Sequence, residues 1–194
     1  MNLIFDFGGV LIDWDPHHLY DPYFGSRART DWFLQNVCTM DWNVQMDGGK
    51  PFAEGVAELS ARFPEWSREI AMFRDEWIKM VAGPIPGMYE FVLEMKAAGH
   101  GVWGLSNWSV ETFPLICGDY PVLRELDGMV VSGYEGVTKP DAAIYRLLLE
   151  RYGLRAEDCI FIDDNPANVA GAEAVGIRGI RFVSAEKLRN SIIF

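Results

Sequence analysis

Four short segments of this chain end in side chains that could carry chemistry. Asp6 closes an apolar run at the N-terminus, and Ser106 follows a second run. Lys139 stands in a loop just before a predicted helix, and the acid pair 163–164 follows the apolar run 160–162. Each residue alone could cap a helix or shape a turn. Together, an acid, a hydroxyl, a lysine and an acid pair form the set that metal-assisted phosphoryl transfer needs.

The chemistry of a phosphate monoester explains each of these residue types. Its negative charge repels a carboxylate nucleophile, so a divalent cation has to lie between them. Asp6 and Asp164 could supply carboxylate ligands to Mg²⁺, which prefers hard oxygen atoms. Lys139 would place a positive charge on the phosphoryl oxygens, and Ser106 would donate a hydrogen bond to them. Asp6 would then attack phosphorus, giving an aspartyl phosphate that water breaks down.

The elements that must position these residues alternate between two sequence patterns. Short apolar runs of strand length are separated by segments whose apolar residues repeat with helical period. This alternation predicts an α/β fold with a Rossmann-like parallel sheet and right-handed crossovers. The carboxyl ends of parallel strands share one edge, so the four segments would bring their side chains together. The predicted strands are 1–7, 101–105, 128–131, 160–162 and 177–183, and the predicted helices are 88–98, 142–152 and 167–175.

One region interrupts this alternation and contains no convincing strand. We predict that it is an all-helical cap over residues 15–82, inserted into an α/β core made of 1–14 and 83–194. Several tryptophans gather in or beside this region, and we interpret them as its core rather than as a ligand cage. The amphipathic stretches lie near 30–37, 41–46, 51–63 and 65–80, and the tryptophans are Trp14, Trp32, Trp42, Trp66 and Trp77.

Composition and charge narrow the class of protein further. The chain has 194 residues, of which 49% are hydrophobic and 23% charged, as in ordinary globular domains. Its net charge of −11 disfavours nucleic acid and anionic membranes as partners. No stretch approaches the roughly 18 apolar residues of a membrane span, and the N-terminus lacks the basic region of a signal peptide, so we predict a cytoplasmic protein. The cysteines have no metal-ligand spacing and are predicted to be buried free thiols.

Four motifs carry a resemblance to a known family. They read FDFGGVLID (5–13), GVWGLSN (101–107), TKPDAAIYRLLLERYGL (138–154) and CIFIDDNPANVAGAEAVGI (159–177). In this order and spacing they resemble the haloacid dehalogenase (HAD) superfamily of hydrolases, in the branch with a helical cap inserted after the first motif. The resemblance is closest to phosphatases that act on glucose 1-phosphate and to the N-terminal phosphatase domain of soluble epoxide hydrolases.

The resemblance implies a role for the residues that would handle the phosphate. Asp6 becomes the nucleophile. Ser106 and Lys139 become the phosphate-binding pair, helped by the backbone of Asn107. The implied substrate is a small phosphorylated metabolite, with sugar phosphates among the candidates.

The resemblance also implies a magnesium site. Asp6 would be one ligand and the backbone carbonyl of Gly8 another. In the acid pair of the fourth motif, Asp164 is the expected metal ligand and Asp163 supports the metal site from the preceding position. Asn168 takes the place of a further polar group of that motif. The implied cofactor is therefore Mg²⁺.

The sequence departs from the family pattern at Gly8. Most phosphatases of the family have a second aspartate there, which acts as general acid and base, and a glycine cannot protonate a leaving oxygen. Water or another acid would have to substitute for it. Asp13 and Asp15 are candidates for that role, and solvated hinge residues are the competing interpretation of both.

Two other functions are compatible with a missing acid. A metal-independent 2-haloacid dehalogenase would attack carbon with the same aspartate, but the adjacent acids 163–164 would then lack a cation to hold. A non-catalytic binding module of the same fold would also have lost the acid. Such a module would rarely keep the complete set of Asp6, Ser106, Lys139 and Asp164.

Overall fold

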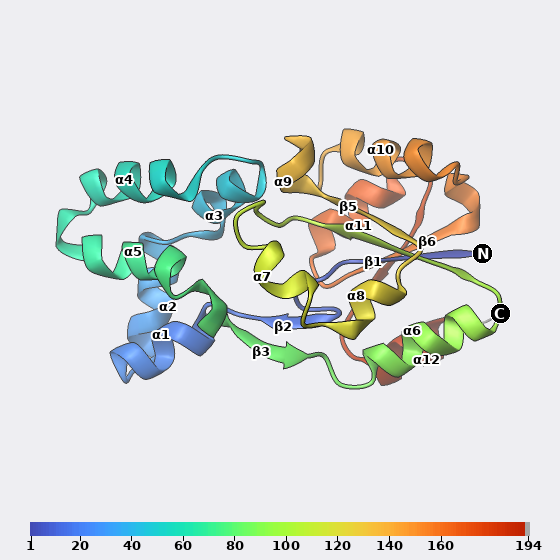
Figure 1. Cartoon of the computed structure of the whole chain (residues 1–194), viewed down its shortest axis with the longest axis horizontal. Helices are drawn as coiled ribbons and strands as arrows, with labels where there is room; N and C mark the ends of the chain where they lie inside the picture. Colours follow the sequence, from blue (N-terminus) through green and yellow to red (C-terminus); the bar gives the residue numbers. More distant parts are fainter. Residues whose placement is uncertain (193–194) are drawn as a thin grey trace.

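A five-stranded parallel sheet forms the centre of the protein, whose computed structural model describes residues 1–192. The strand order is β5-β4-β1-β6-β7, so the N-terminal strand lies in the middle (Figure 1). All five strands were predicted from the sequence, and the Rossmann-like α/β fold class is confirmed. Their bounds are β1 Asn2–Phe5, β4 Gly101–Ser106, β5 Gly128–Val131, β6 Cys159–Asp163 and β7 Arg178–Arg181.

Alternation along β1 divides the core between the two faces of the sheet. Leu3 and Phe5 belong to one buried cluster and Ile4 to a second, because successive side chains of a strand point to opposite faces. Helices α6, α8 and α12 supply side chains to the first cluster, whereas α10 and α11 supply them to the second. Figure 1 shows these two helix groups on opposite sides of the sheet. Their bounds are α6 Met88–Ala97, α8 Pro121–Glu125, α10 Ala142–Tyr152, α11 Pro166–Glu173 and α12 Ala185–Ser191.

The region between residues 15 and 82 folds into helices that lie beyond one end of the sheet (Figure 1). Ser26 and Thr39 cap two of them, each accepting a hydrogen bond from a backbone N–H of the first turn. One helix, α1, was not predicted; it contains Pro22, a residue that usually interrupts a helix. The helices are α1 His17–Phe24, α2 Arg27–Asn36, α3 Met40–Asp47, α4 Phe52–Arg62 and α5 Ser67–Asp75, with 3₁₀ turns at Pro64–Trp66 and Trp77–Met80.

A two-stranded antiparallel ribbon connects these helices to the sheet. It pairs β2 (Ile12–Trp14) with β3 (Val81–Pro84), and the sequence did not predict it. Neither strand is a continuous apolar run, because Asp13 interrupts the first and Gly83 precedes a proline in the second. The ribbon brackets the predicted insertion, and we propose that 15–82 is a cap domain hinged on it. The remaining short elements are α7 Pro114–Cys117, α9 Ser132–Glu135 and a 3₁₀ turn at Ala156–Asp158.

Four of the five tryptophans of this region belong to one buried cluster or pack against it. Trp42 and Trp66 pack against other aromatic rings of the helices. The ring centroids are 5.1 Å apart for Trp42 and Phe73 and 5.3 Å apart for Trp66 and Phe33. Trp32 is about half exposed, and Trp14 and Trp77 line a cavity described below. The prediction that the tryptophans are core residues is therefore confirmed for Trp14, Trp42, Trp66 and Trp77, which belong to the main buried cluster or pack against it, and is wrong for Trp32.

Two smaller predictions can be compared with the structure directly. The three cysteines are free thiols, as expected, and Cys38 and Cys159 are buried, but Cys117 is exposed, so its predicted burial is wrong. Within residues 1–192, none of the helices has the length and apolar character required to cross a bilayer.

Candidate active site

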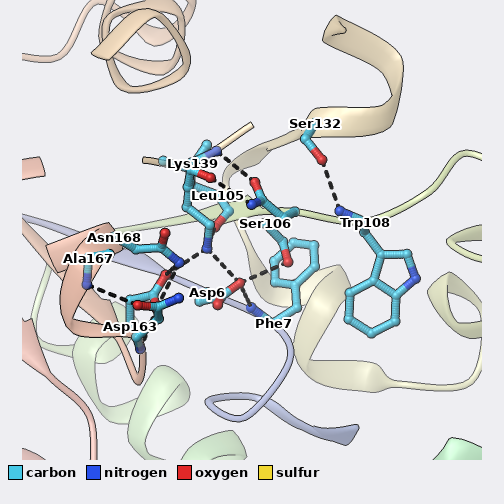
Figure 2. A network of polar contacts seen from close by, with 12 residues as sticks. Asp6, Phe7, Leu105, Ser106, Trp108, Ser132, Lys139, Asp163, Ala167 and Asn168 are labelled. Atoms are coloured by element: carbon cyan, nitrogen blue, oxygen red, sulfur yellow. Dashed lines mark hydrogen bonds and ion pairs between the residues drawn. The ribbon is translucent and has the colours of Figure 1, made fainter. Parts of the chain in front are cut away.

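Asp6 lies directly beyond the central strand and is almost completely buried. Its backbone N–H donates to the carbonyl of Ile162 at 2.9 Å, which continues the pairing of β1 with β6 past the end of β1. Its carboxylate oxygen Oδ1 accepts from the Phe7 N–H at 2.6 Å and from the Ser106 hydroxyl at 2.8 Å. The same oxygen lies 2.8 Å from the ammonium of Lys139 (Figure 2). Three donors thus fix one oxygen of Asp6 and leave Oδ2 outside this set of contacts.

Lys139 is buried and held at both its backbone and its side chain. The Asn107 side chain accepts from the Lys139 N–H at 2.8 Å and donates to the Lys139 carbonyl at 3.0 Å. The Lys139 ammonium donates to the carbonyl of Leu105 at 3.0 Å and to Asp163 Oδ2 at 2.7 Å, besides its contact with Asp6. Figure 2 shows the lysine reaching toward both carboxylates. The predicted convergence of Asp6, Ser106 and Lys139 is therefore present at the carboxyl edge of the sheet.

Asp163 is fully buried, and hydrogen bonds occupy both of its oxygens. Oδ1 accepts from the Asn165 N–H at 2.8 Å, and the Asn168 amide reaches both oxygens at 3.2 and 3.0 Å. Oδ2 also accepts from Lys139. Asn168 is itself fixed, because its carbonyl accepts from the Tyr145 hydroxyl at 2.7 Å. This pattern favours a role for Asp163 in orienting the lysine rather than in direct metal ligation.

Asp164 follows at the end of β6 and lies against the loop that carries Asp6. A Cβ placed on Gly9 would come within 2.7 Å of Asp164 Oδ2, and Gly9 has a positive φ of 76°. The positive φ favours glycine at position 9, and a side chain there would displace the Asp164 carboxylate. One ligand atom each from Asp6, Asp163 and Asp164 lies within 4.8 Å of the others. That clustering is close enough for a single cation to bridge carboxylates.

The electrostatics of this cluster show an excess of negative charge. Burial raises the pKa of Asp6 to about 7, although Lys139 acts in the opposite direction. Burial alone would lower the pKa of Lys139, but the adjacent Asp6 and Asp163 outweigh it and the pKa is raised. Desolvation, followed by the charge of Asp163, also raises the pKa of Asp164. Three carboxyl groups face one lysine, so the donor set fits a divalent cation with oxygen ligands.

A cavity of about 520 Å³ opens over this cluster, within the size range of small-molecule sites. Its floor is the sheet edge, with Asp6, Ser106 and Lys139. Its other walls come from the β2 ribbon, the loop after β4 and the inserted helices. Those walls contribute indole rings, two apolar side chains and several polar groups, namely Trp14, Trp77, Trp108, Met40, Val44, Asp41, Asn43 and Asp47.

The cavity includes two acids that sequence reasoning missed, Asp41 and Asp47, and omits two that it considered. Asp47, the last residue of α3, lines the cavity. Its sequence context, an acid in an amphipathic stretch, gave no signal that it faces the sheet. The cavity lining includes neither Asp13, which bonds His18 at 3.0 Å, nor Asp15, which accepts from the His17 N–H at 2.8 Å at the start of α1. The interpretation of Asp13 and Asp15 as hinge residues is the one that this geometry favours.

The fold and the site together define a parallel α/β enzyme with its reactive groups at the carboxyl edge of the sheet. Comparison with known families makes this specific. The sequence profile of the haloacid dehalogenase-like hydrolases matches residues 1–176, so the chain belongs to this family and is a HAD-family hydrolase. The predicted superfamily is thereby confirmed.

Individual proteins similar to the chain include two fungal ones and a bacterial one. Drimenol cyclase of Aspergillus calidoustus is 30% identical over 98% of the chain, which spans only 35% of that protein. A sesquiterpene phosphatase of Aspergillus oryzae is 27% identical over 94% of the chain and 89% of its own length. A HAD-family enzyme from Bacteroides thetaiotaomicron, solved with magnesium and inorganic phosphate, is 20% identical with a TM-score of 0.74, covering 99% of this chain and 98% of its own.

Proposed function

We propose that this protein is a magnesium-dependent phosphatase that hydrolyses a phosphate monoester through an aspartyl phosphate on Asp6. The observation that carries the proposal is the set of contacts around Asp6. Ser106 and Lys139 hold one carboxylate oxygen at 2.8 Å each, so the side chain is oriented before substrate arrives. The sesquiterpene phosphatase relative supports the reaction class.

The phosphate would be bound by the residues that surround the nucleophile. Lys139 supplies a fixed positive charge, and its burial away from bulk water strengthens that charge's effect on a phosphoryl oxygen. The Ser106 hydroxyl and the Asn107 backbone N–H are the neighbouring donors expected from the sequence. The Asn107 side chain also forms two hydrogen bonds with the backbone of Lys139, which join the two phosphate-binding segments.

The residues that would hold Mg²⁺ are Asp6, Asp164 and the backbone carbonyl of Gly8, with Asp163 in support. Magnesium, when bound, supplies positive charge that neutralises the phosphate ester and screens it from the nucleophile. The chain's own part is to keep Asp164 beside the Asp6 loop, which the absence of a side chain at Gly9 permits. The pKa values of Asp6 and Asp164 are raised, which means that their ionised forms are destabilised. A bound cation would stabilise those ionised forms.

The alternative functions account for less of this geometry. A metal-independent 2-haloacid dehalogenase has no use for three carboxyl groups within 4.8 Å of one another. A binding module that had lost catalysis would have no need to keep Lys139 buried between Asp6 and Asp163, an arrangement that is costly to desolvate. We therefore retain the phosphatase as the proposal.

The cavity walls point to an ester whose organic part is largely apolar. Three indoles, Trp14, Trp77 and Trp108, stand against the polar floor, with centroid separations of 6.5 and 5.5 Å from the ring of Trp108. Met40 and Val44 extend the apolar wall. A prenyl-type phosphate, the class to which the relative's name points, would bury more surface here than a sugar phosphate, whose hydroxyls need many partners.

The test compares esters that share a phosphate and differ in their organic part. Purified protein is stripped of metal with EDTA and assayed for phosphate release from farnesyl monophosphate and glucose 1-phosphate, with and without Mg²⁺. We expect release only with Mg²⁺, and faster from the prenyl ester. Asp6→Asn should reduce it by about 10⁴-fold or more. The matched control Asp13→Asn changes an acid outside the cavity and should keep full turnover.

Two results would contradict the proposal. Equal activity in EDTA and in Mg²⁺ would exclude the metal-dependent reaction. Persistent activity in Asp6→Asn would exclude the covalent route. Faster release from glucose 1-phosphate would leave the reaction standing and overturn only the apolar assignment of the substrate.

A further inference from the structure

The active site needs a proton donor for the leaving oxygen, and Gly8 does not provide one. A Cβ at Gly8 would make only ordinary contacts, at 3.7 Å to Trp108 and 3.9 Å to Trp14, so the backbone position itself tolerates a side-chain carbon. The acids that line the cavity are Asp6, Asp41, Asp47 and Asp164. Two of these belong to the nucleophile and metal cluster, and Asp41 is exposed. Asp47 is the remaining candidate.

Asp47 is held to the phosphate-binding side of the cavity by several hydrogen bonds. Its backbone carbonyl accepts from the Ser132 hydroxyl at 2.5 Å, and that hydroxyl accepts from the Trp108 N–H at 2.9 Å. Its carboxylate accepts from the Asn43 amide at 3.0 Å, and the nearby Ser109 backbone N–H acts to lower its pKa. Both Trp108 and Ser109 belong to the loop that begins at Asn107, so Asp47 is fixed relative to the predicted phosphate site even though it belongs to an inserted helix.

The position of Asp47 disfavours ionisation of its carboxyl group. An acid with a purely structural role would not be expected at such a position. It is the last residue of α3, where the helix dipole disfavours a negative charge. Burial raises the pKa of Asp47 to about 7, against the opposing influence of Lys139 and of the Ser109 hydrogen bond. A carboxyl group with a pKa near neutrality can both release and accept a proton at physiological pH.

Among the charged groups around Asp47, Lys139 is the one whose charge affects the pKa of Asp47. Helices α4 and α9 pack against α3, and their charged residues have other partners. Glu135 of α9 pairs with Arg151, and Glu58 of α4 pairs with Lys50. In the loop after β4, the Glu111 carboxylate accepts from the Phe52 N–H at 2.7 Å. The cavity itself adds the acids Asp6, Asp41 and Asp164.

We propose that Asp47 is the general acid and base of the reaction, in place of the acid absent at Gly8. The proposal rests on the proposed phosphatase function. In the first step an Asp6 oxygen bonds to phosphorus while the ester P–O bond breaks, and the Asp47 carboxyl proton passes to the departing oxygen, which leaves as the alcohol. In the second step the Asp47 carboxylate takes a proton from water. The water oxygen bonds to phosphorus, the bond from Asp6 to phosphorus breaks, and inorganic phosphate leaves with Asp47 protonated again.

The test uses two phosphate esters that differ in their need for a proton. The 2,4-dinitrophenolate group leaves without protonation, whereas the alkoxide of 3-phenylpropyl phosphate needs it. The quantity measured is kcat/KM with Mg²⁺, because it reports the steps up to phosphoryl transfer and not the later breakdown of the intermediate. Asp47→Asn should lower kcat/KM for the alkyl ester by about 100-fold or more and change the dinitrophenyl ester by about threefold or less.

Controls separate an acid from a positioning residue. Asp47→Asn preserves side-chain size and one acceptor oxygen, and Asp47→Glu, which keeps an acid, should restore part of the alkyl activity. Asp75→Asn, which changes an exposed acid of α5 outside the cavity lining, should leave the ratio of the two esters unchanged. In the wild type, kcat/KM for the alkyl ester should fall as the pH rises above about 7. Asp47→Asn should not show this fall.

Each outcome decides the assignment. Equal losses on both esters, or no loss on either, would overturn Asp47 as the acid while leaving the phosphatase in place. If the wild type hydrolyses neither ester in Mg²⁺, the proposed function fails, and the assignment of Asp47 fails with it.

Discussion

Replacing Asp47 by asparagine should stabilise the folded protein at neutral and alkaline pH while it impairs catalysis. The folded state raises the pKa of this carboxyl group to about 7, chiefly through burial. In the unfolded chain the same group titrates near the ordinary aspartate pKa of about 3.9. Folding therefore disfavours the charged form of Asp47. The buried charge lowers the free energy of unfolding, and asparagine, which carries no charge, removes this loss.

The sign and pH window follow from these two values. Below about pH 4 both states hold the proton, and the substitution has no electrostatic effect. Between about pH 4 and pH 7 the unfolded chain loses its proton while the folded protein keeps it, so the stability of the wild type falls with rising pH. Above pH 7 both states are ionised and the cost is constant.

The size of the effect follows from the shift in pKa. About three pKa units at 1.36 kcal/mol each correspond to about 4 kcal/mol. The Asp47 side chain is partly exposed to cavity water, and solvent screening reduces this to about 2 kcal/mol. For a chain of this length, that difference corresponds to a rise in Tm of about 4–8 °C.

The assay is urea unfolding of metal-free wild type and Asp47→Asn at pH values between 4 and 8.5. We expect the two free energies of unfolding to agree at pH 4 and to diverge by about 2 kcal/mol at pH 8. Asp41→Asn is the matched control, because this exposed acid in the first turn of α3 should change stability by only a few tenths of a kcal/mol. A difference that does not vary with pH, or an Asp47→Asn variant less stable at pH 8, would refute the reasoning.

Three further predictions concern the cluster at the sheet edge. Lys139→Met should lower the free energy of unfolding at pH 7 by about 3–5 kcal/mol, measured by urea unfolding, because it leaves the buried carboxylates of Asp6 and Asp163 without their cation. Asp164→Asn should abolish most of the rise in Tm that Mg²⁺ produces in the wild type, measured by thermal shift with Ca²⁺-free buffers; an unchanged rise would exclude Asp164 as a ligand. Gly9→Ala should destabilise the protein and weaken the Mg²⁺-dependent rise in Tm, because its Cβ would lie 2.7 Å from Asp164 Oδ2 at a positive φ. The matched variant Gly8→Ala, whose Cβ meets nothing closer than 3.7 Å, should show neither effect.

Much of the fold could be predicted because it depends on local patterns. The strand 128–131 and the helix 142–152 have the predicted bounds, and the other sheet strands overlap their predicted runs. These segments combine a clear apolar period with Pro or Gly at their ends, so local sequence and tertiary packing agree. The ribbon of β2 and β3 had no such signal, because each strand is defined by its partner about 70 residues away in the chain.

The sequence by itself determined which residues converge at the carboxyl edge. Asp6, Ser106, Lys139 and Asp164 each follow or adjoin a strand of a parallel sheet, and that topology brings strand ends together whatever the details of packing. It also showed that Gly8 lacks an acid. These conclusions need only residue type and order along the chain.

Only the tertiary structure decided how the converging residues divide their tasks. The two oxygens of Asp163 proved to be engaged by Lys139 and by Asn168, which no spacing rule reveals. Asp47 lies on an inserted helix, 41 positions from Asp6 in the chain. It lines the cavity, and its backbone carbonyl accepts a hydrogen bond from Ser132. Contacts between segments far apart in the chain depend on how helices dock on the sheet. The pKa of a buried acid depends on that docking, because desolvation is a property of the surroundings and not of the residue.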